Sequence, residues 1–437
     1  MEGVAERVLR LLEEYPLCDS CLGRMFALLG RGLSNAERGR ALKLIAVMEL
    51  HRRIREGDEE ARALFRRLAP RLGRVAAGLY RELFGEEPGL EACHICGGSL
   101  EDRVAYAGGD AVNRLRYVDV SSFLVAARIP DDVRAREDEV KLRHGLQYSE
   151  SIGAEVRREV SKRVQAELGL TPDFEAPDVL VEVDLGTWTT RLEFMPLLIR
   201  GRYWKTARRV SQSIWVTRRG ERRYPFSVED GLSRLADIYE ADDVVLHGAG
   251  REDADVRMLG TGRPFIAEAK AAKRRGVSVR AAEAEINRGS RGLVEFRLEG
   301  RARRRDVAGV KGVDGKHGKV YKALVVLDRE VGDDDLAMLE EFFANRAVRQ
   351  RTPRRVRHRR PDVVRERVVH RVSTRRLGRR VFEALIYAEG GLYIKELVSG
   401  DGGDTAPSFA SVLGAAAYCA ELDVVAVTGG RRAAGSL

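Results

Sequence analysis

The sequence predicts an α+β fold built from three consecutive parts, and three observations support this. Over the first hundred residues, apolar side chains recur at intervals of three and four, which is typical of amphipathic helices. From about residue 101 onward, short runs with the alternating pattern of strands are mixed with further helices. Two Cys-x-x-Cys pairs bracket the helical part and predict a metal ion that closes it.

We expect domain boundaries near residues 100 and 215. The predicted parts are a helical metal-binding subdomain (1–100), an α/β domain (101–215) and a mixed α/β domain (216–437). With 437 residues and 44% hydrophobic residues, each part can form a core. No apolar run approaches the roughly eighteen residues that span a bilayer, and the N-terminus MEGVAERVLRLLEEYPLC lacks a signal-peptide core. We therefore expect a cytoplasmic monomer without membrane contact.

The four paired cysteines predict a structural zinc site in the helical part. One Cys-x-x-Cys turn presents two thiolates to one side of a metal, and a second turn completes a tetrahedron without an open position. Redox pairs and simply buried thiols remain alternatives. His94, inside the second turn, could replace one thiolate, and Cys419 is predicted to be a core residue. The predicted ligands are Cys18, Cys21, Cys93 and Cys96.

The charge distribution favours a polyanionic partner. The net charge is +10, and residues 350–380 contain thirteen arginines against only Asp362 and Glu366. Because DVVRERVVHRV alternates valine with charged residues at strand spacing, we expect a folded basic surface rather than a disordered tail.

The α/β part carries a second RNA-suited pattern. We expect a helix over 156–169 and strands over 178–186, 190–199 and 200–206. In GRYWKTARRVSQSIW, cations such as Arg202 and Lys205 alternate with aromatic rings such as Trp215. Such a surface can stack on bases and bind phosphates, although a half-buried strand edge has the same pattern.

In the last part, Ser227 is predicted to cap a helix with Asp230 at its third position. The strands DDVVLH, PFIAEAK and KVYKALVVL are expected there. RRVFEALIYAEGGLYIKELVSG predicts a hairpin that turns at Gly390 and Gly391. Nucleotide loops are excluded: GVDGKHGKVY has the wrong spacing for a phosphate-cradling loop, and Gly248-Ala-Gly250 lacks a third glycine.

Three short motifs resemble the motifs of a known enzyme family. GRED at 250–253, KVYKA at 319–323 and YIKEL at 393–397 resemble, in order, the three motifs of pseudouridine synthases. Together with LCDSCLGRMFALLG, GREDADVRMLGTGRPF and QRTPRRVRHRR, they are similar to the archaeal tRNA pseudouridine synthases that modify uridines 54 and 55 in the TΨC loop. That family has a zinc-bound N-terminal domain containing a THUMP domain. Two departures are Leu392 where the family has Thr, and Asp404 where it has Arg.

The resemblance implies a THUMP-like central domain and a mixed-sheet catalytic domain. It implies that Asp253 is the catalytic carboxylate, that Tyr321 stacks on the uracil, and that Lys395 pairs with Asp253. Arg251 and Ile394 would contact the flipped nucleotide.

The chemistry fits these residue types. Breaking the N1–C1′ bond of uridine and rejoining the base through C5 needs a carboxylate that attacks C1′ or removes the 2′ proton, and a pocket that holds the freed base. The reaction is redox-neutral and requires no cofactor, so zinc would be structural only.

Alternatives remain open at this point. Asp255 could be the essential acid instead of Asp253. The chain could also be a non-catalytic tRNA-binding protein, whereas a THUMP-containing methyltransferase or thiolase would need a nucleotide or methyl-donor loop that the sequence lacks. Which of positions 54 and 55 is modified stays open.

Overall fold

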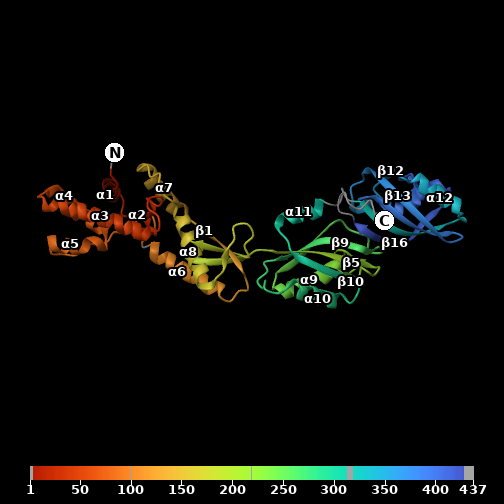
Figure 1. Ribbon diagram of the computed structural model, residues 1–437, viewed down its shortest axis with the longest axis horizontal. Coiled ribbons are helices and arrows are strands. Elements are labelled where there is room, and N and C mark those ends of the chain that lie inside the picture. The colour runs from red at the N-terminus through yellow and green to blue at the C-terminus, as the bar shows by residue number, and fades with distance from the viewer. Residues whose placement is uncertain (1–2, 99, 218, 313–317, 428–437) are drawn as a thin grey trace. The chain divides into compact units, whose positions relative to one another are not determined.

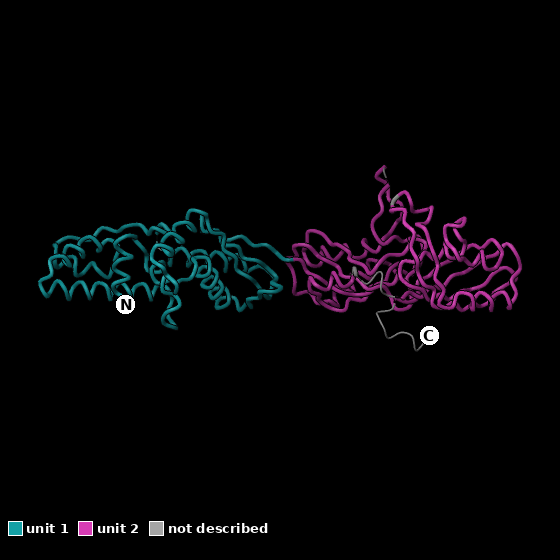
Figure 2. Tube along the Cα trace, turned by 90° about the horizontal axis from the view of Figure 1, so that it is seen from above, with its two compact units in different colours: residues 1–195 teal, residues 196–437 magenta. Residues whose placement is uncertain are grey.

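The structure of the protein, a computed structural model, describes residues 3–98, 100–217, 219–312 and 318–427. It divides into two compact units, residues 1–195 and 196–437 (Figure 2). Most of the glycine-rich loop that was compared with nucleotide-binding loops, residues 313–317, lies outside the described residues. Within the described residues, no helix is long and apolar enough to cross a membrane.

The first unit combines helices with a small sheet (Figure 1). Its helices are α1 (Val4–Glu14), α2 (Asp19–Arg24), α3 (Asn35–Arg55), α4 (Glu59–Leu72), α5 (Arg74–Phe84), α6 (Leu100–Leu115), α7 (Asp131–Arg143) and α8 (Ile152–Leu168). Its strands are β1 (Ser122–Arg128), β2 (Thr171–Pro172), β3 (Val179–Asp184) and β4 (Thr189–Phe194), in the order β2-β1-β3-β4. One apolar core extends from Val8 to Leu185, so the expected boundary near residue 100 does not separate two cores.

The second unit is built on one large mixed sheet (Figure 1). Its main strands are β5 (Leu197–Lys205), β8 (Asp243–Gly248), β9 (Arg257–Lys270), β10 (Val294–Arg301), β11 (Gly318–Leu327), β12 (Arg346–Arg351), β13 (Val364–Gly378), β14 (Val381–Glu389), β15 (Thr405–Ala406) and β16 (Ala417–Val427). Short β6 (Val210–Ser211) and β7 (Phe226–Ser227) pair separately.

Helices cover this sheet in two groups. Helices α9 (Val228–Tyr239) and α10 (Val279–Ser290) pack together against the half that holds β5, β9 and β10, and α12 (Asp333–Phe342) packs on β13. The remaining helical segments are α11 (Arg304–Gly312), η2 (Arg354–Arg359), α13 (Ile394–Ser399), η3 (Gly400–Gly403) and α14 (Phe409–Leu413). The predicted cap of α9 is confirmed, because the Ser227 hydroxyl accepts from the Asp230 amide at 3.1 Å.

Strand register brings distant segments together at the middle of the sheet. The sheet order is β10-β5-β9-β16-β11-β14-β13-β12-β15, with β8 beside β9. Val424 of β16 pairs with Met258 of β9 on one side and with Tyr321 of β11 on the other. The start of β9 and the middle of β11 are therefore separated by a single strand, although they lie more than sixty residues apart in sequence.

Two sequence expectations are wrong. The boundary expected at residue 215 lies at 195, because Pro196 interrupts the expected strand 190–199, and β5 joins the large sheet by pairing with β9 and β10. The expected hairpin after β14 is a turn followed by helix α13. Ile394, Leu397 and Val398 have helical spacing, but a short apolar run fits a helix or a strand equally well.

Helices α2 and α3 approach so closely that a glycine is needed on each. A Cβ atom on Gly39 would lie 1.8 Å from the Asp19 carbonyl oxygen, and one on Gly23 would lie 1.8 Å from the Asn35 carbonyl oxygen. Because both contacts are with backbone, neither can be relieved by turning a side chain. This packing fixes the helix that carries Cys21.

Gly39→Ala should lower the free energy of unfolding of the first unit by about 2–3 kcal/mol, because overpacking forces the two helices apart. The matched control is Gly78→Ala in α5, where a Cβ atom meets nothing within 4 Å. That control should raise stability by roughly 0.5–1 kcal/mol because alanine favours the helix. Urea unfolding followed by circular dichroism measures both; equal effects of the two variants would contradict the close approach.

Candidate active site and metal-binding site

The loop between β8 and β9 carries the first predicted motif. It covers residues 249–256 and leads directly into β9, beside the pairing of Met258 with Val424 described above. Gly250 has φ of 75°, a left-handed conformation that a glycine adopts without strain. The amide of Ala249 donates to the Pro264 carbonyl at 3.0 Å, and the amide of Val256 donates to the Asp253 carbonyl at 3.1 Å.

A cluster of buried charged side chains holds this loop in place. The Glu252 side chain is 1% exposed and pairs with Arg263, also 1% exposed, at 2.8 Å. Its carboxylate accepts from the Tyr203 hydroxyl at 3.1 Å and lies 3.7 Å from the Lys205 ammonium. Arg263 also donates to the Ala249 carbonyl at 2.6 Å. Because a buried charge is tolerated only with partners, this cluster holds the loop in one place.

Lys205 has a different role from the expected RNA contact. Its side chain is fully buried, and its ammonium donates at 2.8 Å to the carbonyls of both Asp253 and Val210. Burial lowers the pKa of Lys205, and the nearby negative charge of Glu252 offsets part of this decrease. The alternation of cations and aromatic residues in β5 therefore reflects a half-buried strand at this position, and Lys205 supports the loop backbone.

Arg202 remains partly exposed on the same strand. Its guanidinium donates to the Thr261 carbonyl at 3.0 Å and lies 3.4 Å from Glu299. It does not line the pocket described next. Its expected contact with RNA stays a prediction.

The predicted active-site residues gather around one pocket of about 740 Å³. Asp253 comes from the β8–β9 loop, Tyr321 from β11, and Lys395 from the start of α13. Tyr321 is 8% exposed. Arg251 and Ile394 also line the pocket. The five residues that the sequence places in the catalytic and uracil-binding positions therefore face one cavity within the second unit.

Asp253 and Asp255 differ in their surroundings. Asp253 lines the pocket with a side chain that is 34% exposed, whereas Asp255 is outside the pocket lining and 63% exposed. Lys395 lies 3.8 Å from Asp253 and 2.6 Å from Asp255, so the expected pairing is shared between the two acids. Although burial raises the pKa of Asp255, the hydrogen bond and charge of Lys395 lower it below its usual value.

The sequence reasoning missed Arg355, the nearest cation to Asp253. Its Nη1 lies 2.7 Å from Oδ2 of Asp253, and its Nε lies 2.7 Å from Oε1 of Glu396. Arg355 belongs to the arginine run of residues 350–380, and nothing in that run marks one arginine as turned inward. Arg360, Arg365 and Arg367 of the same run line the pocket as well, which supports the expected basic surface.

Asp404, which stands where the resembling family has an arginine, binds two arginines of η2. Oδ2 of Asp404 accepts from Arg354 at 2.9 Å and from Arg357 at 2.6 Å. The amide of Arg354 also donates to Asp401 at 3.0 Å. These acids tie η2 to the segment that follows α13.

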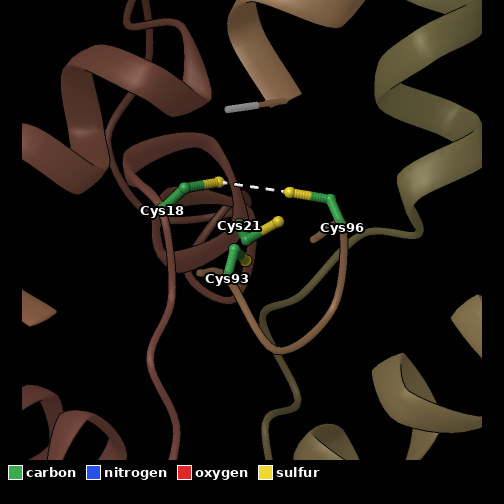
Figure 3. A group of neighbouring side chains, drawn as sticks. All are labelled: Cys18, Cys21, Cys93 and Cys96. Carbon is green, nitrogen blue, oxygen red and sulfur yellow. Dashed lines mark hydrogen bonds between the residues drawn. The ribbon is translucent and has the colours of Figure 1, made fainter. Parts of the chain in front are cut away.

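In the first unit, the two Cys-x-x-Cys pairs meet as expected (Figure 3). The four sulfur atoms of Cys18, Cys21, Cys93 and Cys96 lie within 4.8 Å of one another, and those of Cys18 and Cys96 are 3.7 Å apart. A tetrahedral zinc ion with Zn–S bonds near 2.3 Å requires sulfur separations of about 3.8 Å. The set therefore fits a closed metal site. His94 faces Tyr15 and Glu139 instead and is not part of the cluster.

A buried arginine joins this cluster to the rest of the unit. Arg24 is fully buried and donates to the Cys21 sulfur at 2.9 Å. It also lies 2.8 Å from Glu137 of α7 and 3.8 Å from Glu155 of α8. A cation beside the sulfur favours the thiolate form that a metal binds. The metal site is thus tied to both helices.

Comparisons with known proteins agree with this arrangement. A family model described as "Pus10, C-terminal" matches residues 198–428, and one described as "Pus10 THUMP domain, archaeal" matches residues 108–184. Both fall within single structural units. The first match begins two residues after the unit boundary that the structure shows.

Curated relatives match along nearly the whole chain. A protein of Aeropyrum pernix named tRNA pseudouridine synthase Pus10 is 46% identical over 427 residues, which are 97% of each chain. Proteins with the same name from Ignisphaera aggregans and Methanocaldococcus jannaschii are 42% and 37% identical, covering 95% of this chain and 97% and 93% of theirs. These similarities define a tRNA pseudouridine synthase. The chain belongs to the Pus10 family.

The buried cluster yields a stability prediction. Glu252→Gln should lower the free energy of unfolding of the second unit by about 3–5 kcal/mol, because it leaves Arg263 and Lys205 buried without an anion. The control, Glu295→Gln, removes the same charge from an exposed position of β10 and should change stability by less than about 0.5 kcal/mol. Chemical unfolding monitored by fluorescence compares the two, and a mild effect at Glu252 would argue against the anchoring role.

Proposed function

We propose that the protein isomerises uridine to pseudouridine at position 54, position 55 or both in the TΨC loop of tRNA, with Asp253 as the catalytic carboxylate. The observation that carries this is the gathering of Asp253, Tyr321 and Lys395 around one pocket. The family match supports the substrate class, since relatives of this length carry the name tRNA pseudouridine synthase.

In the proposed reaction, the target uridine leaves its stack and enters the pocket. Asp253 then attacks C1′ or removes the 2′ proton while the N1–C1′ bond breaks. The freed uracil turns and C5 bonds to C1′, while the Asp253–C1′ bond breaks in the first route or the proton taken by Asp253 returns to C2′ in the second. The C5 proton leaves and N1 gains one, so that the product is an isomer of the substrate. Ring stacking on Tyr321 holds the base during the turn, and the low exposure of this tyrosine keeps water away.

The basic pocket rim and a nearby hairpin support tRNA as the partner. Arg360 and Arg365 line the pocket and are exposed, as phosphate-binding arginines must be. In the hairpin that precedes β7, the rings of Trp215 and Tyr224 lie 5.9 Å apart, and the Arg223 guanidinium lies 4.7 Å from the Trp215 ring. Aromatic rings and guanidinium groups gathered in this way can stack on unpaired bases. We propose that this hairpin contacts the RNA loop.

We propose that the four cysteines hold zinc, which would close the first unit structurally and take no part in the reaction. Four thiolates would leave no coordination position for a substrate. Free thiols of this kind persist in a reducing compartment, which supports a cytoplasmic location. We also propose that the chain acts as a monomer.

The first experiment tests the reaction and the residue. Wild-type protein incubated with tRNA carrying tritium at uridine C5 should release tritium, and Asp253→Ala should reduce the rate by about 10⁴-fold or more because the reacting group is lost. Asp255→Ala is the matched control and should retain activity within about tenfold, since Asp255 lies outside the pocket lining.

Two results would contradict the proposal in different ways. Wild-type protein that binds tRNA without releasing tritium would indicate a non-catalytic binding protein. Full activity of Asp253→Ala would show that another residue reacts. Mapping of the modified sites on tRNA would show whether position 54, 55 or both are modified.

The second experiment tests the metal. Elemental analysis after dialysis should find about one zinc ion per wild-type chain and almost none in Cys18→Ser or Cys93→Ser, because three thiolates hold the ion weakly. Cys419→Ser replaces a buried cysteine in the second unit and should keep the zinc. Full zinc content in the first two variants would exclude this site.

A further inference from the structure

Arg355 occupies an unusual position within the arginine-rich segment. Its guanidinium connects two carboxylates from different elements, binding Asp253 of the β8–β9 loop through Nη1 and Glu396 of α13 through Nε, both at 2.7 Å. Glu396 is buried, at 5% exposure, and follows Lys395 directly. The other arginines of η2 with described acidic partners, Arg354 and Arg357, bind Asp404 on the segment after α13.

We propose that Arg355 is a positioning residue that holds Asp253 by one oxygen, Oδ2, so that the other oxygen, Oδ1, faces the target nucleotide. This inference rests on the proposed function of Asp253. Both nearby cations approach the same atom, since Arg355 lies 2.7 Å and Lys395 3.8 Å from Oδ2. Among the described residues, Oδ2 of Asp253 accepts a hydrogen bond from Arg355, and Oδ1 accepts none from a side chain or a backbone amide.

The shape of the guanidinium explains why an arginine stands here. Its Nε–H and Nη–H groups point in fixed, separate directions, so one planar group can bind two carboxylates at once. Held at both ends, Arg355 cannot follow Asp253 if that side chain rotates. A lysine ammonium could supply the charge to Asp253 but would not preserve this fixed bridge to Glu396.

The frame around Arg355 is itself fixed. Asp401 accepts from the Arg354 amide at 3.0 Å, and Asp404 binds two arginines of η2. On the other side, the side-chain amide of Gln350 exchanges hydrogen bonds of 2.8 and 3.0 Å with the backbone of Tyr393, immediately before α13. The segment that carries Arg355 and the helix that carries Glu396 are thus held beside the edge of the sheet formed by β12 and β15.

Several charged groups surround Asp253. From its own loop come Arg251, Glu252 and Asp255; from other elements come Lys205 of β5, Arg355 of η2, Lys395 and Glu396 of α13, and the pocket-lining Arg263, Lys319, Arg360, Arg365 and Arg367. Of these, Arg355 makes the shortest contact with the carboxylate. Its removal should therefore release the Asp253 side chain more than the removal of any other of these cations.

The test measures kcat and KM from tritium release, together with tRNA binding. Arg355→Gln should lower kcat by about 100-fold because the carboxylate is no longer aimed, while KM and tRNA affinity change less than about threefold. Arg355→Lys keeps the charge but not the bridge to Glu396, and should restore only part of kcat. Glu396→Gln should lower kcat by about tenfold, since Arg355 loses its anchor.

The control is Arg376→Gln, which removes an arginine of the same 350–380 run that pairs with the exposed Asp333 and lies outside the pocket lining. It should keep kcat within about threefold of the wild-type value. Melting temperatures of all variants check the fold, and Arg355→Lys decides the matter if Arg355→Gln unfolds.

The proposal is overturned if Arg355→Gln keeps the wild-type kcat, or if it weakens tRNA binding without changing kcat, which would make Arg355 an RNA contact. It is also overturned if Arg355→Lys has the full wild-type kcat, since the bridge to Glu396 would then be unnecessary, or if Glu396→Gln leaves kcat unchanged. Failure of the proposed function is separate, because then the wild type itself releases no tritium.

Discussion

Burial of the Glu252 carboxylate is the constraint on which the site in the second unit depends. Once this charge is removed from water, it must be matched by Arg263 and Lys205 and by the Tyr203 hydroxyl. Burial, together with the Glu252 charge, raises the pKa of Tyr203, so its hydroxyl stays protonated as a donor. The loop backbone is held by the same cations, because Arg263 and Lys205 also bind loop carbonyls. Asp253 is left at the surface of this anchored loop, facing the pocket.

The second requirement is the order of strands in the sheet. Parallel pairing of β16 with β9 and antiparallel pairing with β11 places the loop before β9 near Tyr321. Helix α13 then supplies Lys395 and Glu396 from the end of β14, which pairs with β11. Three segments that are each about seventy residues apart in sequence therefore meet over the central strands. A slip of one residue in β11 would turn Tyr321 to the opposite face.

The first unit follows the same principle with another buried cation. Arg24 is matched by Glu137 and Glu155 and donates to the Cys21 sulfur. Because its partners lie on α7 and α8, the cysteine cluster is linked to both helices, and α8 packs on β1 of the small sheet. In both units, a buried charge joins elements that have no covalent link nearby. Each connection places a functional or metal-binding group relative to the core.

The sequence by itself determined those helices and strands that local patterns mark. It also determined the paired cysteines and the three motifs that contain Asp253, Tyr321 and Lys395. These features depend on spacing along the chain, so they can be read without knowing which segments meet. The capping pair Ser227 and Asp230 is of this kind, and it was predicted correctly. The hairpin expected at residues 390–400 was wrong because a short apolar run does not distinguish a strand from a helix.

Only the tertiary structure decided which charged residues lie inside. Lys205 and Arg202 stand three residues apart on one strand, yet the first is buried against the loop and the second is partly exposed. Arg355 is one of thirteen arginines in its segment, and its bridge between Asp253 and Glu396 depends on where α13 begins. The domain boundary at residue 195 was likewise decided by the sheet that β5 joins. The physical reason is that ion pairs and paired strands join residues far apart in sequence. The packing of the whole fold determines which of these residues become partners.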